Sequence, residues 1–321
     1  MNKIKINIKE GLTQKIMGDL SQVSNSTISR YISANKILPI DNGSKRNLRY
    51  SVKNVRHIIR ETSPLHFKNK KKRQAFCNFK SATGKTSICL QISSHLAMMG
   101  YNILVIDTDP QASLSMSLGI LKENNLTLYD LIYSNQNAEK VIKNIYPGLD
   151  CIPSNLSIIT LEKELMDMPQ YEKRITMTLD LLEKQYDFIF LDTSPTISSL
   201  NRNILHFSDV VNIVCDDHLY NLNSLKLLIK DFDKFSYGKR IENKCLNIIS
   251  NKYEAKNNSS EAVMLMLKSH YSDFFIEDFT VRKSEDIIAS SKIWKPLAFF
   301  SKRTSKGLKD IIKIVHYIAK N

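Results

Sequence analysis

The feature that most constrains this chain is a short polar loop between an apolar run and a helix-like segment. Residues 78–86 read Asn-Phe-Lys-Ser-Ala-Thr-Gly-Lys-Thr, after the uncharged run Ala75–Cys77 and before a helix-like segment from Ser87 to Met99. In a strand–turn–helix of this kind, the N–H groups of the loop and the positive end of the helix dipole point at one anion. The loop is therefore predicted to bind phosphate, with Lys85 beside it and the Thr86 hydroxyl placed for a divalent cation.

The triplet Gly-Lys-Thr is by itself a weak signal, and the commonest phosphate-loop pattern does not fit. That pattern requires glycine at position 79, which is Phe79 here. The loop instead carries a second lysine, Lys80, five residues before Lys85. Its interpretation therefore depends on the rest of the chain.

Two further apolar runs end on carboxylates. Residues 101–106 lead into Asp107-Thr-Asp-Pro-Gln111, and residues 186–191 lead into Asp192. An Asp-Pro pair can simply begin a turn, but ligands of open α/β sheets bind at the carboxyl ends of the strands. More apolar runs follow at 210–215 and 246–250, separated by segments of helical length. This alternation predicts a parallel sheet with right-handed crossovers.

The doubled lysine, the Asp107-x-Asp109-Pro sequence and the strand ending at Asp192 occur in one order across about residues 75–320. Together they resemble the ParA/MinD family, whose phosphate loop is a deviant Walker A motif. The resemblance implies a P-loop NTPase α/β fold with a mostly parallel sheet, and ATP and Mg²⁺ as cofactors. It also implies an Mg-dependent ATPase that forms a homodimer with ATP.

The resemblance also assigns roles to individual residues. Asp109 positions or activates the attacking water, and Lys80 reaches across the dimer to the partner's nucleotide. Thr86, Asp107 and Asp192 form or support the magnesium site, and residues 112–118 resemble the switch region. Nucleotide binding falls to the loop and to one residue after a later strand, namely Ser81, Ala82, Thr83, Gly84, Lys85, Thr86, Ser87 and Asn251, the last as an adenine contact.

The loop departs from the family pattern at Ser81 and Ala82, where the family carries two glycines. Glycine allows a positive φ and a close approach of the backbone to phosphate. Both replacements are small, so two outcomes stay open: ATP binding with slow hydrolysis, or binding without useful turnover.

Charge is segregated along the chain. The net charge is +14, and residues 1–74 carry 17 basic against 4 acidic residues. Residues 282–321 carry 10 basic against 3 acidic residues, which leaves the part between them acidic. Because lysine and arginine release counterions when they bind phosphates, this asymmetry favours nucleic acid as a partner.

The basic N-terminal segment has the pattern of a helix-turn-helix. A helical face at 12, 16, 17 and 20, a short turn, and a capped helix from Asn25 precede a stretch that resembles the wing of MerR-like winged domains. A small helical dimerisation domain with a solvated basic face is the alternative. Predicted DNA contacts are Ser26, Thr27, Ser29, Arg30, Arg46 and Arg49 in the head, and Arg282 and Lys283 near the C-terminus.

The predicted organisation is a helix-turn-helix domain at 1–65, a basic linker at 66–74 and a ParA-type ATPase domain at 75–321. No signal peptide or membrane-length apolar run is present, so we expect a cytoplasmic, nucleoid-associated protein. The amphipathic segment 305–319 is expected to face the core, although MinD-like relatives use such a helix on membranes.

The function expected from the resemblance is plasmid or chromosome partition. It combines ATP-dependent dimerisation and DNA binding, slow hydrolysis stimulated by a ParB-like partner, and repression of the chain's own operon. Two alternatives stay open: a nucleotide-sensing transcription regulator with little or no ATPase activity, and a MinD-like membrane-associated ATPase.

Overall fold

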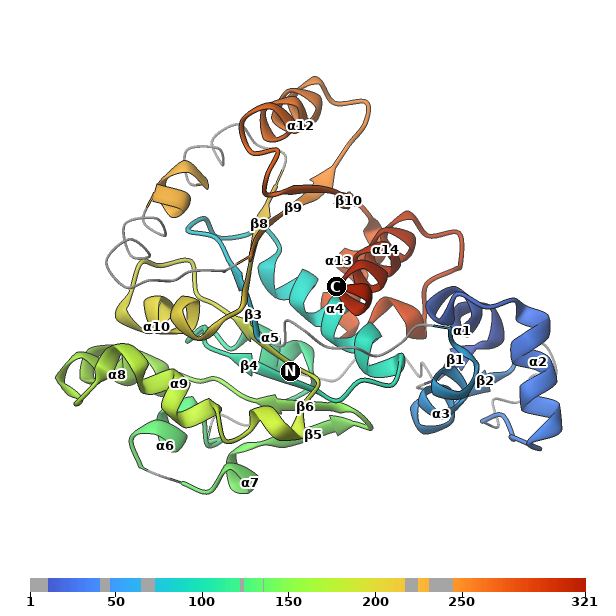
Figure 1. Cartoon of the computed structure of the whole chain (residues 1–321), viewed down its shortest axis with the longest axis horizontal. Coiled ribbons are helices and arrows are strands. Elements are labelled where there is room, and N and C mark those ends of the chain that lie inside the picture. Colours follow the sequence, from blue (N-terminus) through green and yellow to red (C-terminus); the bar gives the residue numbers. More distant parts are fainter. Residues whose placement is uncertain are drawn as a thin grey trace.

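The computed structural model describes residues 11–40, 47–64, 73–121, 124–134, 136–216, 225–230 and 245–321. These residues form an eight-stranded sheet with helices on both faces and a small helical head at one side (Figure 1). The strand order is β10-β9-β8-β3-β7-β4-β6-β5, and only β5 runs antiparallel to its neighbour. The strands are Arg73–Cys77 (β3), Ile103–Asp107 (β4), Lys143–Tyr146 (β5), Leu149–Ile152 (β6), Phe188–Asp192 (β7), Val210–Cys215 (β8), Cys245–Tyr253 (β9) and Phe275–Arg282 (β10).

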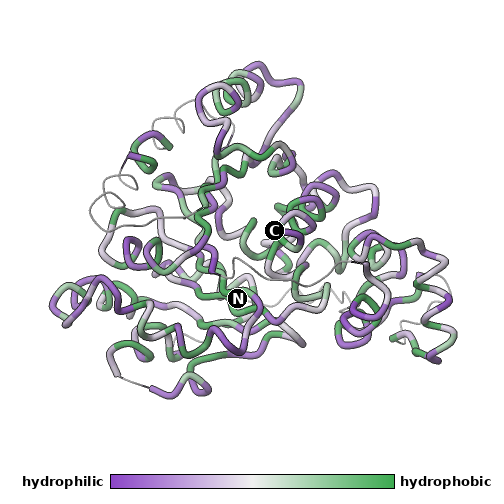
Figure 2. Tube along the Cα trace, in the orientation of Figure 1, coloured by the Kyte–Doolittle hydropathy of each residue, from purple (hydrophilic) through white to green (hydrophobic). Residues whose placement is uncertain are grey.

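The central strands are apolar along their length because helices cover both faces of the sheet. In β4, Ile103 and Val105 point into one hydrophobic core, whereas Leu104 and Ile106 point into the other. Figure 2 shows the hydrophobic strands at the centre and more hydrophilic segments around them. The predicted α/β fold with a mostly parallel sheet is therefore confirmed.

The helices divide between the two cores. One core holds α4 (Lys85–Met98) and α14 (Lys306–Lys320), with α5 (Ser113–Ser117) and α13 (Glu285–Ile293) beside them. The other core is covered by shorter helices and by α12. These are α6 (Leu128–Ile132), α7 (Ala138–Val141), α8 (Ser157–Glu164), α9 (Arg174–Leu179), α10 (Ser199–Phe207) and α12 (Asn258–His270).

The position of helix α14 decides between the two roles considered for the amphipathic segment 305–319, packing on the core or binding a membrane. Its apolar positions 308, 311, 312, 315, 318 and 319 are all buried against the sheet and α4. The expectation that this helix faces the core is confirmed, and its apolar face is not available to a lipid surface. Within the described residues, no helix is long and apolar enough to cross a membrane.

The head contains β1 (Leu12–Thr13), α1 (Gln14–Ser21), α2 (Asn25–Ala34), β2 (Arg49–Tyr50) and α3 (Val52–Thr62). Each helix begins at a hydroxyl side chain that accepts a backbone N–H: Thr13, Ser24 and Ser51, respectively. Strands β1 and β2 pair antiparallel, and Ile40 bridges to Arg49. The predicted helices are confirmed, whereas residues 41–46, the middle of the predicted wing at 37–50, lie outside the described residues.

The head and the sheet share one hydrophobic core, which joins residues of α1 and α3 to α4 and α14. Polar contacts reinforce the junction, because Arg303 forms a two-bond ion pair with Asp19, and His316 bonds Gln22 and the Leu20 carbonyl. The two predicted domains therefore pack as one body. The expected linker also ends earlier than predicted, since Arg73 already belongs to β3; residues 65–72 lie outside the described part of the chain.

Candidate nucleotide site

The loop 78–84 joins the end of β3 to the start of α4, at the carboxyl edge of the sheet. Gly84, at the helix N-cap, has φ +96°, and a Cβ there would overlap the side-chain amide of Asn251. Ala82 also adopts the left-handed conformation, with φ +60°, whereas Ser81 does not. A non-glycine residue in this region carries a strain of about 1–2 kcal/mol. Of the two departures from the family pattern, only Ala82 therefore imposes strain.

A hydroxyl and a carboxylate meet below the loop. The Thr86 hydroxyl donates to Asp192 Oδ2 at 2.7 Å, and Asp192 lies at the end of β7, beside β3. The other oxygen, Asp192 Oδ1, is buried with no hydrogen-bond partner among the described residues. Burial and the neighbouring Asp107 raise the pKa of Asp192 to about 8. A divalent cation fits this donor set, because it would satisfy the orphaned oxygen and favour the charged carboxylate.

Asp107 holds the segment that follows β4. Its Oδ1 accepts the Asp109 N–H at 3.1 Å, and its Oδ2 accepts the Ser115 N–H and hydroxyl at 2.8 and 2.7 Å. Burial raises the pKa of Asp107 to about 6, and these hydrogen bonds oppose that shift. Both Asp107 oxygens are thus engaged within the protein, so its position relative to a metal stays a prediction, while its contacts fix Asp109 and the start of α5.

The two loop lysines have different surroundings. Lys85 is buried, its ammonium lies 3.5 Å from the Lys80 carbonyl, and burial lowers its pKa while Asp192 opposes that shift. Lys80 is partly exposed, and its ammonium lies 3.9 Å from the buried Asp216. Lys252 approaches the same carboxylate at 4.0 Å. Lys85 is thus placed under the loop, whereas Lys80 points toward the end of β8.

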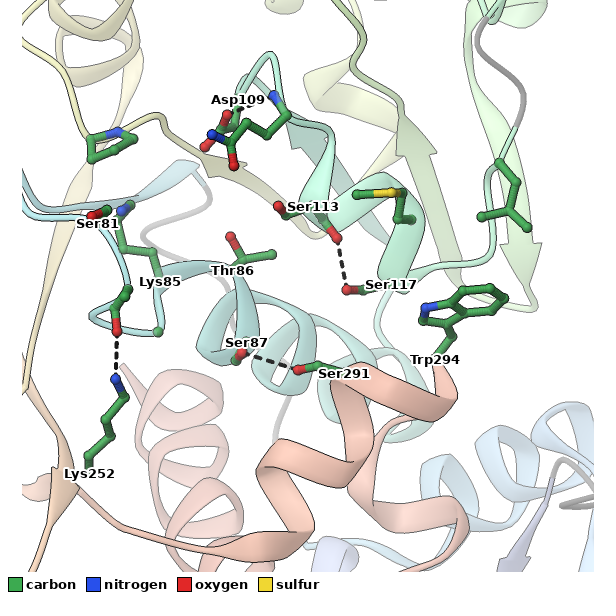
Figure 3. A pocket seen from close by; sticks show the side chains of 16 residues that line it. Ser81, Lys85, Thr86, Ser87, Asp109, Ser113, Ser117, Lys252, Ser291 and Trp294 are labelled. Carbon is green, nitrogen blue, oxygen red and sulfur yellow. Dashed lines mark hydrogen bonds between the residues drawn. The ribbon is translucent and has the colours of Figure 1, made fainter. Parts of the chain in front are cut away.

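A cavity of about 1070 Å³ opens beside the loop. In Figure 3, Lys85, Thr86, Asp109 and Ser113 surround it, with Trp294 at one end and Lys252 at the other. The predicted residues Ser81, Ala82, Gly84, Lys85, Thr86, Ser87 and Asp109 line it. The structure thus brings most of the predicted nucleotide-binding residues to one cavity large enough for a nucleoside triphosphate.

Apart from the buried Asp107 and Asp192, three of the predicted site residues lie outside the cavity lining. The Asn251 amide is buried and donates to the Thr83 carbonyl at 2.8 Å, so it supports the loop from below and its placement does not favour an adenine contact. Thr83 is itself buried rather than lining the cavity. Lys80 lies outside the cavity lining as well, beside Asp216.

No individual contact was predicted for Ser115, which lies in the predicted switch-like region, or for Lys252. Ser115 bonds Asp107 from eight residues away, and its spacing alone gives no sign of this contact. Lys252 follows Asn251 at the end of β9 and donates to the Ala82 carbonyl at 2.6 Å. The available signal for Lys252 was its position, because it is a basic residue that directly follows Asn251, which had been assigned to the nucleotide.

The predicted DNA contacts of the head fall into two groups. Ser26, Thr27 and Arg30 are exposed on α2 and Ser29 is partly exposed, as a groove-reading helix requires, whereas Arg46 lies outside the described residues. The Arg49 guanidinium instead donates to the carbonyls of Gly11 and Phe299, at 2.7 Å each. Its engagement inside the protein does not support a phosphate contact.

The C-terminal pair also differs in its surroundings. Arg282 forms a two-bond ion pair with the buried Asp310 of α14, at 2.8 and 2.6 Å, and so ties β10 to that helix. Lys283 is exposed and pairs with Glu254 at 2.8 Å. A phosphate contact is therefore disfavoured for Arg282 and stays a prediction for Lys283.

Comparison with known proteins identifies relatives of this chain. Residues 71–248, more than half of the chain, match a family model described as an AAA domain. The cell division protein PomZ of Myxococcus xanthus is 30% identical over 249 residues, 77% of each chain. The chromosome partitioning protein ParA of Caulobacter vibrioides is 25% identical over 232 residues, which cover 70% of this chain and 86% of ParA. The chain belongs to the ParA family.

A solved structure shows the same fold for this ParA-family chain. A Borrelia burgdorferi protein described as a plasmid partition protein, bound to AMPPNP, superposes with a TM-score of 0.66 at 21% identity. The match covers 78% of this chain and all of the Borrelia chain. At this level of identity the likeness establishes the fold, and the site residues above rest on the geometry of this chain.

Proposed function

We propose that this ParA-family chain is a partition ATPase that binds ATP with Mg²⁺ in the cavity beside the loop. The observation that carries the proposal is the Thr86–Asp192 pair below the loop, with its buried, unpartnered Asp192 Oδ1. Thr86 and Asp192 would hold the cation, which would neutralise charge on the phosphates. The binding of AMPPNP by the Borrelia protein of the same fold supports the choice of ligand.

In phosphoryl transfer to water, different residues bind the phosphates and orient the water. The N–H groups of the loop and the Lys85 ammonium bind and orient the phosphates, in a site where burial strengthens each contact. Asp109 lines the cavity, and its backbone N–H donates to Asp107, which supports a role for its carboxylate in orienting a water molecule. The strain at Ala82 supports slow hydrolysis.

DNA is the proposed second ligand. The exposed hydroxyl and basic side chains of α2 support sequence-specific binding by a winged helix-turn-helix, and the segregated positive charge supports nonspecific binding. Because Arg282 is engaged by Asp310, we assign the nonspecific surface to exposed lysines of the C-terminal region. These are Lys283, Lys292, Lys302 and Lys306.

The proposed cycle joins the two activities. ATP drives formation of a homodimer in which Lys80 leaves Asp216 for the partner's nucleotide, and a ParB-like protein stimulates hydrolysis and releases the DNA. The head represses the chain's own operon. One observation favours the alternative of a nucleotide-sensing transcription regulator: the head packs directly on α4, whose other end begins at the loop.

Phosphate release and DNA retardation test the proposal. We expect slow Mg-dependent ATP hydrolysis that DNA increases, and DNA retardation that requires ATP. Tight ATP binding with zero turnover would contradict the ATPase activity but not the ATP-dependent switch. In cells, loss of plasmid segregation with retained repression in Lys85→Ala would support partition, whereas loss of repression alone would support the regulator.

A further inference from the structure

The loop holds a left-handed turn without the glycine that such a turn favours. Ala82 has φ +60°, and its backbone strain must be offset for the loop to persist in one conformation. Ser81, the other residue at a family glycine position, is not in this region of φ. Any compensating contact is therefore expected at Ala82 itself.

The end of β9 supplies two such contacts. Asn251 donates from its side-chain amide to the Thr83 carbonyl at 2.8 Å, and Lys252 donates from its ammonium to the Ala82 carbonyl at 2.6 Å. Figure 3 shows the second bond, from Lys252 to the loop. Two consecutive residues of one strand thus hold two consecutive carbonyls of the loop.

We propose that Lys252 is a positioning residue of the nucleotide site, which holds the strained turn at Ala82 in the conformation that binds phosphate. The peptide group is planar and trans, so its carbonyl and its N–H point in opposite directions. A bond that fixes the Ala82 carbonyl therefore also fixes the direction of the Thr83 N–H. The amide of Asn251 fixes the Gly84 N–H in the same way.

The charge of Lys252 fits this role. Its ammonium lies 4.0 Å from Asp216, which is buried, and Lys252 lines the cavity. A charged donor to a carbonyl makes a stronger hydrogen bond than a neutral one. The role deepens the proposed ATP binding and rests on it for its effect on affinity.

A double-mutant cycle with AMPPNP and Mg²⁺ tests the role, with binding followed by the fluorescence of Trp294. This residue is the chain's single tryptophan and lines the cavity. We expect Lys252→Met to weaken binding on the order of tenfold in the natural sequence, and no more than about twofold in an Ala82→Gly background. Glycine adopts the turn without strain, so it removes most of the need for the clamp.

Two controls separate the clamp from simple charge loss. Lys256→Met removes an exposed lysine four residues away, and Ser81→Gly places glycine at the unstrained position. We expect the first to leave affinity unchanged and the second to leave the effect of Lys252→Met undiminished. An equal loss of affinity in the natural and Ala82→Gly backgrounds, or no loss in either, would overturn the proposal.

The clamp has a second readout that does not require nucleotide. Thermal unfolding of the four ligand-free proteins of the cycle measures the same coupling. Lys252→Met is expected to lower Tm less with alanine than with glycine at position 82, because an alanine turn without the clamp relaxes and recovers its strain. If the natural protein fails to bind AMPPNP while this coupling is present, the proposed function fails and the clamp stands. Additive shifts in Tm would overturn the clamp.

Discussion

The two ends of helix α4 have different partners for the helix dipole. At the N-terminal end, Gly84 and Lys85 begin the helix beside an open cavity, where the dipole is directed at a ligand. At the C-terminal end, the Arg56 guanidinium of the head donates to the carbonyls of Ala97 and Tyr101. One end is arranged for an external anion, whereas the protein itself supplies the cation at the other.

At the head end, the position of the Arg56 guanidinium depends on a glycine at position 148. Arg56 lies over Gly148, where a Cβ would overlap its guanidinium, and its Nη2 also donates to Asn102 Oδ1 at 2.8 Å. Burial lowers the pKa of Arg56 to about 10, which leaves it charged near neutral pH. The comparison predicts that changes at the loop end affect ligand affinity, while changes at the head end affect stability.

The largest effect is expected from Lys85→Ala. Loss of the ammonium under the loop is expected to weaken AMPPNP binding on the order of 100-fold, about 2.7 kcal/mol, and to leave the free energy of unfolding nearly unchanged. Isothermal titration and denaturant unfolding measure the two quantities. Lys163→Ala, at an exposed position on α8, is the control. A large loss of stability with retained affinity would reverse the comparison.

Arg56→Met is expected to show the opposite pattern. It leaves the carbonyls at the end of α4 without their charged donor, so the free energy of unfolding should fall by about 2 kcal/mol. AMPPNP affinity should change less than about twofold, since the loop is at the other end of the helix. Lys53→Met changes an exposed lysine of the same helix α3 and should alter neither quantity. Equal destabilisation by both variants would contradict the role of the cap.

A smaller effect is expected from His95, in the last turn of α4. It is fully buried, its Nδ1 lies 2.6 Å from the Gln91 carbonyl, and burial lowers its pKa from 6.5 to about 4. The folded state therefore resists a proton that the unfolded state accepts, and stability is lost as the pH falls from about 6.5 toward 4.

Between pH 7.5 and 5.5 this loss should amount to about 1 kcal/mol. Denaturant unfolding at both values, for the natural protein and His95→Gln, measures it. The variant should show a shallower pH dependence, because glutamine does not titrate. Identical slopes would mean that His95 does not contribute to the acid sensitivity of this helix.

The sequence predicted the strands and the carboxylates at their ends because both follow from local patterns. The runs ending at Asp107 and Asp192 were placed correctly, and so were the helices of the head. The short strands β5 and β6 and the strand β10 were not anticipated. Their stability comes from pairing with neighbours distant in sequence, which apolar periodicity does not encode.

The candidate site shows the same contrast between residues in local motifs and residues placed by contacts between distant segments. Lys85, Thr86 and Asp109, which the sequence singled out from local motifs, line one cavity in the structure. Asn251 was placed near the nucleotide, but its side chain supports the loop instead, and Lys252 was not anticipated at all. Both depend on how the end of β9 lies against a loop about 170 residues earlier.

By itself, the sequence determined an α/β fold with a phosphate loop, its acidic partners and a basic head, because strand–turn–helix patterns and charge are local properties. Only the tertiary structure decided which basic groups are available to a ligand. Asp310 and the carbonyls at residues 11 and 299 engage Arg282 and Arg49, while the end of β9 holds the turn at Ala82. Contacts between distant segments form only when the chain is packed, and they determine what each of these charges can bind.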